Sequence, residues 1–121
     1  MITIPESTGT RPWLPVCRLD DLEVGWGEAA LLTDDHGKAL QIALFRLGEV
    51  VYATSNTDPA TDVDVMARGI VGSRGDAPTI ASPLHKQVYD LRTGAGLTDP
   101  DLALRTYPTR VCDGIIEITL D

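Results

Sequence analysis

The sequence contains few cysteines: two in 121 residues, Cys17 and Cys112. That number is too small for a disulfide-stapled scaffold, and the two thiols lack the Cys-x-x-Cys spacing of zinc and redox motifs. Each cysteine lies near the end of a short apolar run, where an unpaired thiol usually packs as a small hydrophobe. The sequence therefore predicts two buried free thiols, with a disulfide between the first and last strands as the alternative.

Basic residues are also scarce. There are 10 Lys and Arg against 18 Asp and Glu, which gives a formal net charge of −8 at pH 7. Nucleic acids and anionic membranes both favour clustered cations, so we expect neither as a partner. A protein with a basic patch suits this charge better.

Long apolar runs are missing as well. No stretch approaches the roughly 18 residues that a membrane-spanning helix requires. Met1–Glu6 shows no basic segment followed by an apolar one, the pattern of a secretory signal. These features predict a cytoplasmic protein.

What the sequence has is a series of short strand-like segments between turns. Apolar residues alternate with polar ones, and Asp and Gly mark the turns, which is typical of an all-β chain with antiparallel strands. We expect strands at 28–33, 39–47, 50–53, 79–82, 87–91, 104–112 and 114–120. In the second of these, Leu40, Ile42 and Leu44 fall on one face. Pro108 interrupts the segment before the last and confines it to a sheet edge or a bulge.

Two stretches do not fit this pattern. Residues 1–12 contain Thr, Ser, Gly and two prolines, and we expect a loose N-terminal arm there, ahead of a single domain at 13–121. Residues 55–78 predict one long irregular loop with at most a helical turn at 63–67. Loops of this length are more often functional than idle.

No segment carries a complete catalytic or metal-binding motif of its own. Asp58, Asp62 and Asp64 could suggest a cation-binding loop, but the glycine and glutamate that an EF-hand needs are absent at the required positions. His85 has no recognisable nucleophile or base beside it in sequence. We therefore expect no catalytic residue in this chain.

The most informative stretch is Ser82-Pro83-Leu84-His85-Lys86, which runs directly into Gln87-Val88-Tyr89-Asp90-Leu91-Arg92-Thr93-Gly94. It resembles the second cluster-binding loop of Rieske iron–sulfur domains, in which Cys-Pro-x-His-Gly leads into a Phe/Tyr-Asp-x-x-x-Gly turn. Here Ser82 stands at the cysteine position. The first loop of that family, Cys-x-His, corresponds best to Ser55–Pro59, where Asn56 replaces the cysteine and Asp58 the histidine.

A Rieske centre needs two thiolates and two imidazoles. Among the four ligand positions Asn56, Asp58, Ser82 and His85, only the last keeps a family ligand. The resemblance therefore implies an ISP-type Rieske-like fold without a cluster: an antiparallel β sandwich or partly open barrel with a smaller loop-bearing lobe.

Further segments extend the resemblance over nearly the whole chain. They are similar to the small subunits of NAD(P)H-dependent assimilatory nitrite reductases, which share the Rieske-like fold and lack the cluster ligands. These segments are Trp13–Cys17, Asp20–Gly25, Arg68–Gly72 and Leu91–Gly94. The resemblance implies an accessory subunit with no cofactor of its own. Its partner would be a large subunit that carries siroheme, an iron–sulfur cluster and FAD, and reduces nitrite to ammonium with NAD(P)H.

Five basic residues lie near the two former cluster loops and are the candidate contacts for that partner: Arg68, Arg74, His85, Lys86 and Arg92. Two other functions stay open. The first is a Rieske-type ferredoxin that carries electrons on a cluster with unusual ligands, and iron in the purified chain would favour it. The second is a stand-alone β domain that binds another protein, and a neighbouring gene for a siroheme reductase would exclude it.

Overall fold

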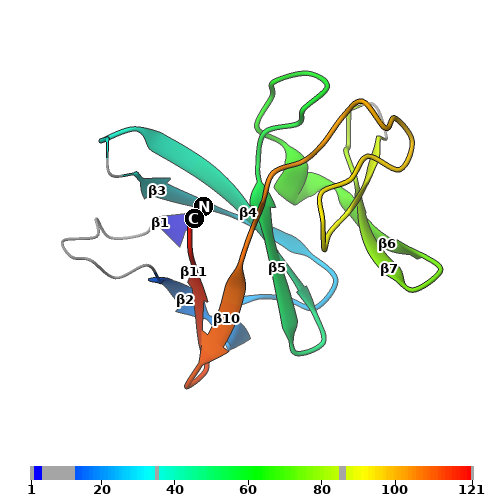
Figure 1. The fold of residues 1–121 in the computed structure, drawn as a ribbon. Helices are drawn as coiled ribbons and strands as arrows, with labels where there is room; N and C mark the ends of the chain where they lie inside the picture. The colour runs from blue at the N-terminus through cyan, green and yellow to red at the C-terminus, as the bar shows by residue number, and fades with distance from the viewer. Residues whose placement is uncertain (1, 4–12, 35, 85–86, 121) are drawn as a thin grey trace.

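The fold is taken from a computed structural model, which describes residues 2–3, 13–34, 36–84 and 87–120. Within these residues the chain forms three sheets and two short 3-10 helices (Figure 1). The first sheet has the order β1-β3-β4-β5-β9, from Ile2–Thr3, Gly27–Thr33, Ala39–Leu47, Val50–Ser55 and Thr106–Tyr107. The second has the order β10-β11-β2, from Thr109–Cys112, Ile115–Ile118 and Leu14–Arg18. The third has the order β6-β7-β8, from Ile70–Arg74, Ala77–Ala81 and Val88–Asp90.

The helices are η1 (Leu19–Asp21) and η2 (Met66–Arg68). Apart from β1, which runs parallel to β3, every strand pair of the described chain is antiparallel. The prediction of an all-β, antiparallel fold is therefore confirmed. No helix in the described part of the chain is long and apolar enough to cross a membrane.

Strands β3, β4 and β5 form the predicted meander. Thr33 lies opposite Ala39 across the first turn, and Leu47 lies opposite Val50 across the second. Asp34 shapes the first turn, because its carboxylate accepts hydrogen bonds from the backbone N–H groups of His36 and Lys38 at 2.9 and 2.8 Å. These bonds hold the pKa of the Asp34 carboxyl below its ordinary value.

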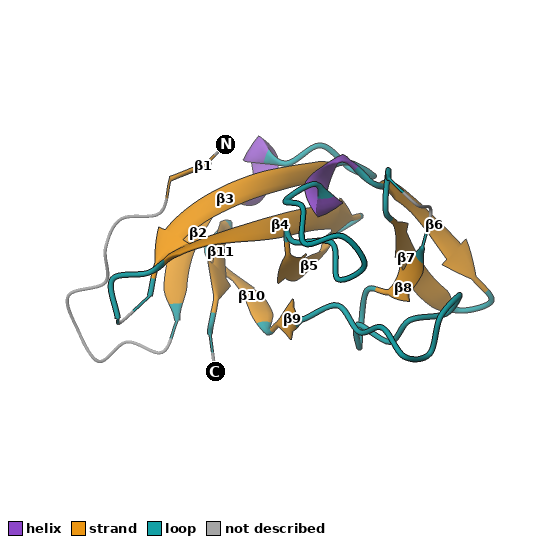
Figure 2. Ribbon diagram, turned by 90° about the horizontal axis from the view of Figure 1, so that it is seen from above, coloured by secondary structure: helices purple, strands orange, loops and turns teal. Residues whose placement is uncertain are grey.

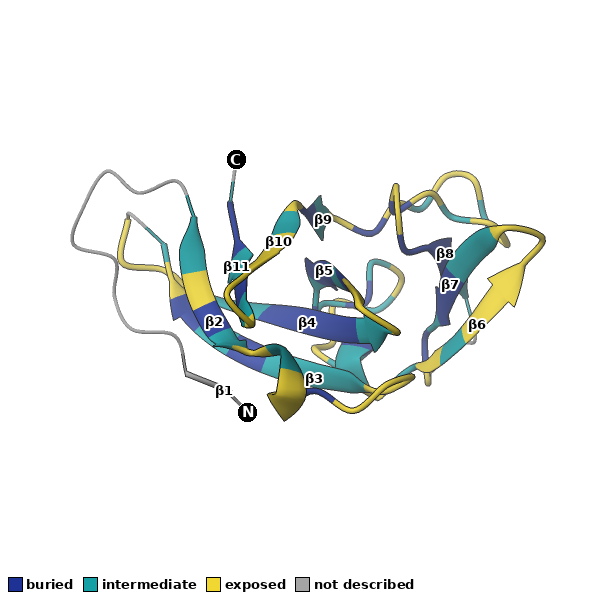
Figure 3. Cartoon of the chain, turned by 90° about the horizontal axis from the view of Figure 1, so that it is seen from below, coloured by how far each residue is buried: buried dark blue, intermediate teal, exposed yellow. Residues whose placement is uncertain are grey.

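Strand β4 is buried on both faces. Ile42 and Leu44 point into a core shared by the first and second sheets, where Leu40 packs at the border as predicted. Ala43 and Phe45 point the other way, into a core shared with the β6–β8 lobe. All four residues from 42 to 45 are 0% exposed. Successive strand residues face opposite sides, so this one strand joins two cores, as its continuous burial in Figure 3 shows.

The third sheet forms a smaller lobe at one end of the molecule, away from β1, β2 and β11 (Figure 2). Its core consists of Met66, Ile80, Tyr89, Leu91 and Leu104 packed against β4. One loop of the candidate site follows β5 of the first sheet, and the other follows β7 of this lobe. The candidate site is therefore built from both parts of the molecule.

Pro108 separates two edge strands, as predicted. Strand β9 ends the first sheet and β10 ends the second, so the chain passes from one sheet to the other at this proline. A residue without a backbone N–H is tolerated there because it interrupts no ladder.

The prediction for residues 55–78 is wrong in its second half. Residues 70–74 form β6, and β7 already begins at Ala77, so the two make a regular hairpin in which Ile70 lies opposite Ala81. Strand β6 is largely exposed and contains Gly72, so it lacks the apolar alternation that reveals a half-buried strand. The one helical turn lies at Met66–Arg68.

The prediction of two buried thiols is wrong for Cys112, which is exposed, whereas Cys17 is partly buried. Both are free, because β11 lies between the strands that carry them. Two strands on either side of a third are about 9.5 Å apart, beyond the reach of a disulfide. Burial, with the charges of Asp21 and Glu28, raises the pKa of Cys17 to about 11, so its thiol stays protonated at neutral pH.

Of the predicted N-terminal arm, Ile2 and Thr3 pair with Ala30 and Leu31 of β3. Residues 4–12 lie outside the described residues. The division into an arm at 1–12 and a domain at 13–121 stays a prediction.

Gly94 illustrates how tightly the lobe is packed. Its φ is +81°, and a Cβ placed there would lie 1.8 Å from the carbonyl oxygen of Leu104. Gly114 has a similar φ of +77° but open space around it. We expect Gly114→Ala to lower the free energy of unfolding by about 1–2 kcal/mol, the cost of a left-handed backbone. Gly94→Ala should cost about 2 kcal/mol more, since the backbone of Leu104 must also move.

Urea unfolding of both variants checks this difference. If both variants lose the same free energy of unfolding, the backbone of Leu104 moves away from the new Cβ without an energetic cost, and the prediction is wrong.

Candidate functional site

The first loop begins where β5 ends, and Asn56 ties it to its surroundings. Asn56 is 3% exposed. Its side-chain amide donates to Oε1 of Gln41 on β4 at 3.0 Å, and its side-chain oxygen accepts the N–H of Ala67 in η2 at 2.8 Å. Its backbone adds bonds to Gln41 and Met66. Both ends of the side-chain amide are thus engaged in the structure of the loop.

Asp58 lies two residues further on and is completely buried. Its Oδ1 accepts the backbone N–H of Ala60 at 2.8 Å, and its carbonyl accepts the N–H of Asp62 at 2.8 Å. The chain turns sharply here, with Asp62 at a positive φ of 60°. The turn directs the Asp58 carboxylate inward, toward the loop that follows β7.

Ser82 begins that second loop and is 1% exposed. Its hydroxyl donates a short hydrogen bond to Oδ2 of Asp58 and accepts the N–H of Leu84 at 3.3 Å. The backbone N–H of Ser82 donates to the carbonyl of Gln87 at 2.9 Å, which closes the loop. We call the side-chain bond between the two loops the Asp58–Ser82 clasp.

Sequence reasoning placed Asn56, Asp58 and Ser82 in neighbouring loops, and the structure brings the last two into direct contact. His85, the fourth position, lies outside the described residues. Gln41 was missed by sequence reasoning. Its only signal is a polar side chain within the apolar run of β4.

Tyr89 lies on β8 beneath the second loop and is 0% exposed. Its hydroxyl has no hydrogen-bond partner among the described residues. Burial, followed by the negative charges of Asp58 and Asp99, raises the pKa of Tyr89. The phenol is therefore neutral at physiological pH and contributes chiefly to packing.

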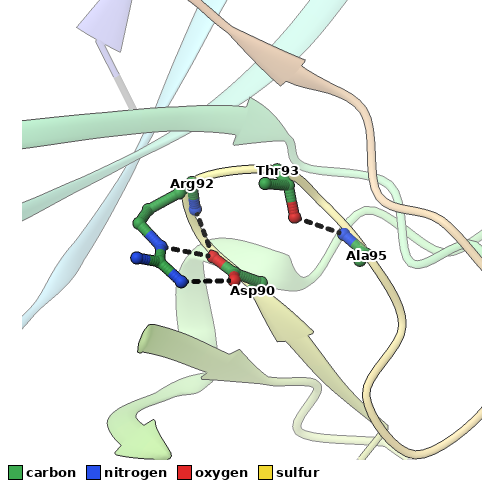
Figure 4. Close-up of polar contacts among 4 residues, drawn as sticks. All are labelled: Asp90, Arg92, Thr93 and Ala95. Carbon is green, nitrogen blue, oxygen red and sulfur yellow. Dashed lines mark hydrogen bonds and ion pairs between the residues drawn. The ribbon is translucent and has the colours of Figure 1, made fainter. Parts of the chain in front are cut away.

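The Tyr-Asp-x-x-x-Gly turn after the second loop is held by Asp90 (Figure 4). Its carboxylate accepts the backbone N–H of Arg92 at 2.8 Å and forms an ion pair with the Arg92 guanidinium at 3.1 Å. These bonds hold the pKa of the Asp90 carboxyl below its ordinary value. A lowered pKa in the folded state means that the pair stabilises the fold at neutral pH and loses this effect as pH falls through that pKa.

The candidate partner-binding residues fall into three groups. Arg68, just before β6, and Arg74, the last residue of β6, are exposed, and neither side chain makes a hydrogen bond or ion pair within the described chain. The guanidinium of Arg92 is half exposed but bound to Asp90. His85 and Lys86 lie outside the described residues. Among the candidates that the structure describes, Arg68 and Arg74 alone combine exposure with an unpaired charge.

A sequence profile for the family described as Rieske-like [2Fe-2S] domain matches residues 12–119. The chain belongs to this Rieske-like family. Within it, the nitrite reductase (NADH) small subunit of Escherichia coli (strain K12) is 33% identical over 108 residues, which cover 88% of this chain and 95% of the relative. The solution structure of the nitrite reductase [NAD(P)H] small subunit from Erwinia carotovora matches with a TM-score of 0.76 and 38% identity, covering 93% of this chain and 84% of that one. The resemblance to small subunits is confirmed.

The Rieske-like domain also matches a second kind of chain. The nitrite reductase [NAD(P)H] large subunit of Klebsiella oxytoca is 38% identical over 105 residues, which cover 87% of this chain but only 10% of that large subunit. In that relative, a segment similar to this chain is part of the large subunit itself.

The residues at the ligand positions of this Rieske-like domain do not fit an iron–sulfur cluster. An amide, a carboxylate and a hydroxyl are hard donors, whereas the cluster requires soft thiolates. Asp58 and Ser82 stand at positions that would bind different irons, so a cluster would have to lie between them. They are instead hydrogen-bonded to each other. Within the described residues, no group of three or more His, Cys, Asp and Glu side chains could hold a metal ion.

The first site prediction concerns the clasp. Ser82→Ala removes a donor from a buried carboxylate and should lower the free energy of unfolding by about 2–3 kcal/mol. Ser73→Ala, at an exposed serine of β6, should change it by less than about 0.5 kcal/mol. In a double-mutant cycle with Asp58→Ala, the coupling energy should be about 1–3 kcal/mol. Additive losses in urea unfolding would mean that the two side chains do not interact.

The second site prediction concerns iron. Reconstitution of the purified chain with iron and sulfide should give no Rieske-type absorption spectrum. Ser82→Cys alone should give none either, because Asn56 and Asp58 still stand where a thiolate and an imidazole are needed. A stable Rieske spectrum from either protein would contradict this assignment of the ligand positions.

Proposed function

We propose that this chain is the small subunit of an NAD(P)H-dependent nitrite reductase and acts as a structural partner of the large subunit. The observation that carries the proposal is the match to small subunits over nearly their whole length. The large subunit would hold the siroheme, iron–sulfur cluster, FAD and NAD(P)H, and would reduce nitrite to ammonium. The small subunit would contribute no redox group of its own.

The large subunit as partner is supported by the Klebsiella oxytoca relative, in which a segment similar to this chain belongs to the large subunit. In that relative the domain is joined to the large subunit covalently. When the same kind of domain is a separate chain, only non-covalent contacts can hold it on the large subunit. Such a chain needs a stable docking surface.

The end of the molecule that bears the two loops is our proposed docking surface. The loop frame persists although Asn56, Asp58 and Ser82 bind no cluster, as expected if the shape of the frame is used for binding. Arg68 and Arg74 supply positive charge beside it, and the sequence adds the basic residues His85 and Lys86 to the second loop. Charges at an interface rim govern association rate and salt dependence.

The two alternative functions have less support. A cluster-carrying ferredoxin requires ligands that Asp58 and Ser82 do not supply, since their side chains bond to each other. A stand-alone binding module does not explain why a similar segment occurs inside a large subunit.

The test is co-expression of this chain with a nitrite reductase large subunit from the same organism. The large subunit should co-purify with the parent chain and reduce nitrite with NAD(P)H. Arg68→Ala with Lys86→Ala should weaken binding about tenfold, an effect of about 1.4 kcal/mol, because two rim charges are lost.

Arg18→Ala with Lys38→Ala is the matched control, since it removes two exposed cations outside the proposed docking surface. Thermal unfolding of each chain alone shows that both double variants fold. If the Arg68 and Lys86 variant binds and supports turnover like the parent at physiological salt, the docking surface lies elsewhere.

A further inference from the structure

The outer edge of β6 is open. Strand β6 pairs with β7 on one side, in a regular register over five residues, and no described strand pairs with its other side. An open edge presents unpaired backbone N–H and C=O groups to any extended chain. Proteins usually protect such edges with prolines, bulges or charged side chains. Strand β6 (Ile70–Arg74) has no proline or bulge, and its single charged residue, Arg74, lies at its end.

Two exposed apolar side chains lie near the start of this edge. Ile70 is 71% exposed and Trp26 is 66% exposed, the highest values among the large apolar residues of the described chain. The chain segments beside these two residues meet where Gly27 packs against η2: a Cβ at Gly27 would lie 2.3 Å from the carbonyl oxygen of Ala67. Trp26 precedes this contact by one residue, and Ile70 follows it by three.

The charge around this edge differs from that of the whole chain. Residues 66–76, which contain β6, carry two cations (Arg68 and Arg74) against one carboxylate (Asp76), whereas the whole chain has a net charge of −8. Arg68 precedes β6 and Arg74 is its last residue, and both side chains lack a partner within the described residues. The edge therefore suits an acidic partner, and the net charge of each copy opposes pairing with a second copy of this chain.

The position of β6 also suits the large subunit as its partner. In the Klebsiella oxytoca relative, the segment similar to this chain is part of the large subunit itself. The first and last strands, β1 and β11, lie at the other end of the molecule (Figures 1 and 2). A covalent link through either of these strands to a larger chain leaves β6 accessible. Figure 3 shows that β6 is exposed along most of its length.

We propose that an extended, acidic segment of the large subunit adds to the open edge of β6 as a further strand, with Trp26 and Ile70 as its apolar anchors. This inference rests on the proposed function and specifies how the partner is held. Main-chain hydrogen bonds give such a complex its affinity, and side chains beside the strand give it specificity. Exposed tryptophan is the residue type most often found to dominate an interface energetically.

The first experiment compares two substitutions on open edge strands. Ile70→Glu replaces an anchor with a charge that repels an acidic segment, and it should weaken binding to the large subunit at least tenfold. Val111→Glu is the matched control, because Val111 is a 40% exposed aliphatic residue on β10, the edge strand of another sheet. It should bind like the parent. Trp26→Ala should weaken binding in the same direction as Ile70→Glu.

The second experiment measures hydrogen–deuterium exchange of the parent chain with and without the large subunit. The outward-facing amides of β6 should exchange at least tenfold more slowly in the complex, and those of β10 should be unchanged. Protection of the loops without protection of β6 would overturn strand addition.

The outcomes separate this inference from the proposed function. If the parent does not bind the large subunit, both fail. If the parent binds and supports nitrite reduction while Ile70→Glu and Trp26→Ala bind equally well, only the β6 proposal fails. Gel filtration of the chain alone tests self-association. If the chain forms a dimer that Ile70→Glu dissociates, and this substitution does not affect binding of the large subunit, the edge serves self-association and the proposal is overturned.

Discussion

The burial of β4 on both faces is the constraint on which the rest of the structure depends. Ile42 and Leu44 pack into one core and Ala43 and Phe45 into the other, so the strand cannot shift by one residue without exchanging the contents of both cores. Gln41 precedes this run and holds Asn56. The register of β4 therefore also fixes where the first loop leaves β5.

The Asp58–Ser82 clasp takes the mechanical place that a cluster holds in a ligand-bearing Rieske domain, where metal bonds join the two loops. Here a buried carboxylate and a hydroxyl join them. A single hydrogen bond is weaker than a set of metal–ligand bonds, so the loops need other support. Asn56 fastens the first loop to β4 and η2, and Asp90 and Gly94 shape the turn behind the second. The frame is thus held by several separate polar contacts.

Sequence reasoning succeeded where local pattern and tertiary burial agree. The β3–β4–β5 meander has apolar alternation and turn residues, and Pro108 can lie only at edges, so these features were predictable. Strand β6 was missed because an exposed edge strand has no apolar face to reveal it. Cys112 was misassigned because an apolar neighbour such as Val111 does not ensure burial on an edge strand, and Val111 itself is 40% exposed. The ligand positions came from the motif, whereas the clasp between them depends on how two distant loops fold.

The uneven charge of the molecule connects the site with its proposed use. Arg68 and Arg74 beside β6 give an otherwise acidic chain a local positive charge that favours approach of an acidic partner toward the β6 lobe, and such steering acts on association rate before any contact forms. That lobe presents the open edge of β6 with Ile70, and Trp26 precedes β3 next to η2. Burial of these two apolar side chains stabilises a complex only once water is excluded. Charge would orient the encounter and burial would hold the complex. A structural role for the proposed small subunit would thus rest on the shape of its loop frame, because that frame and the open edge of β6 lie at the same end of the molecule.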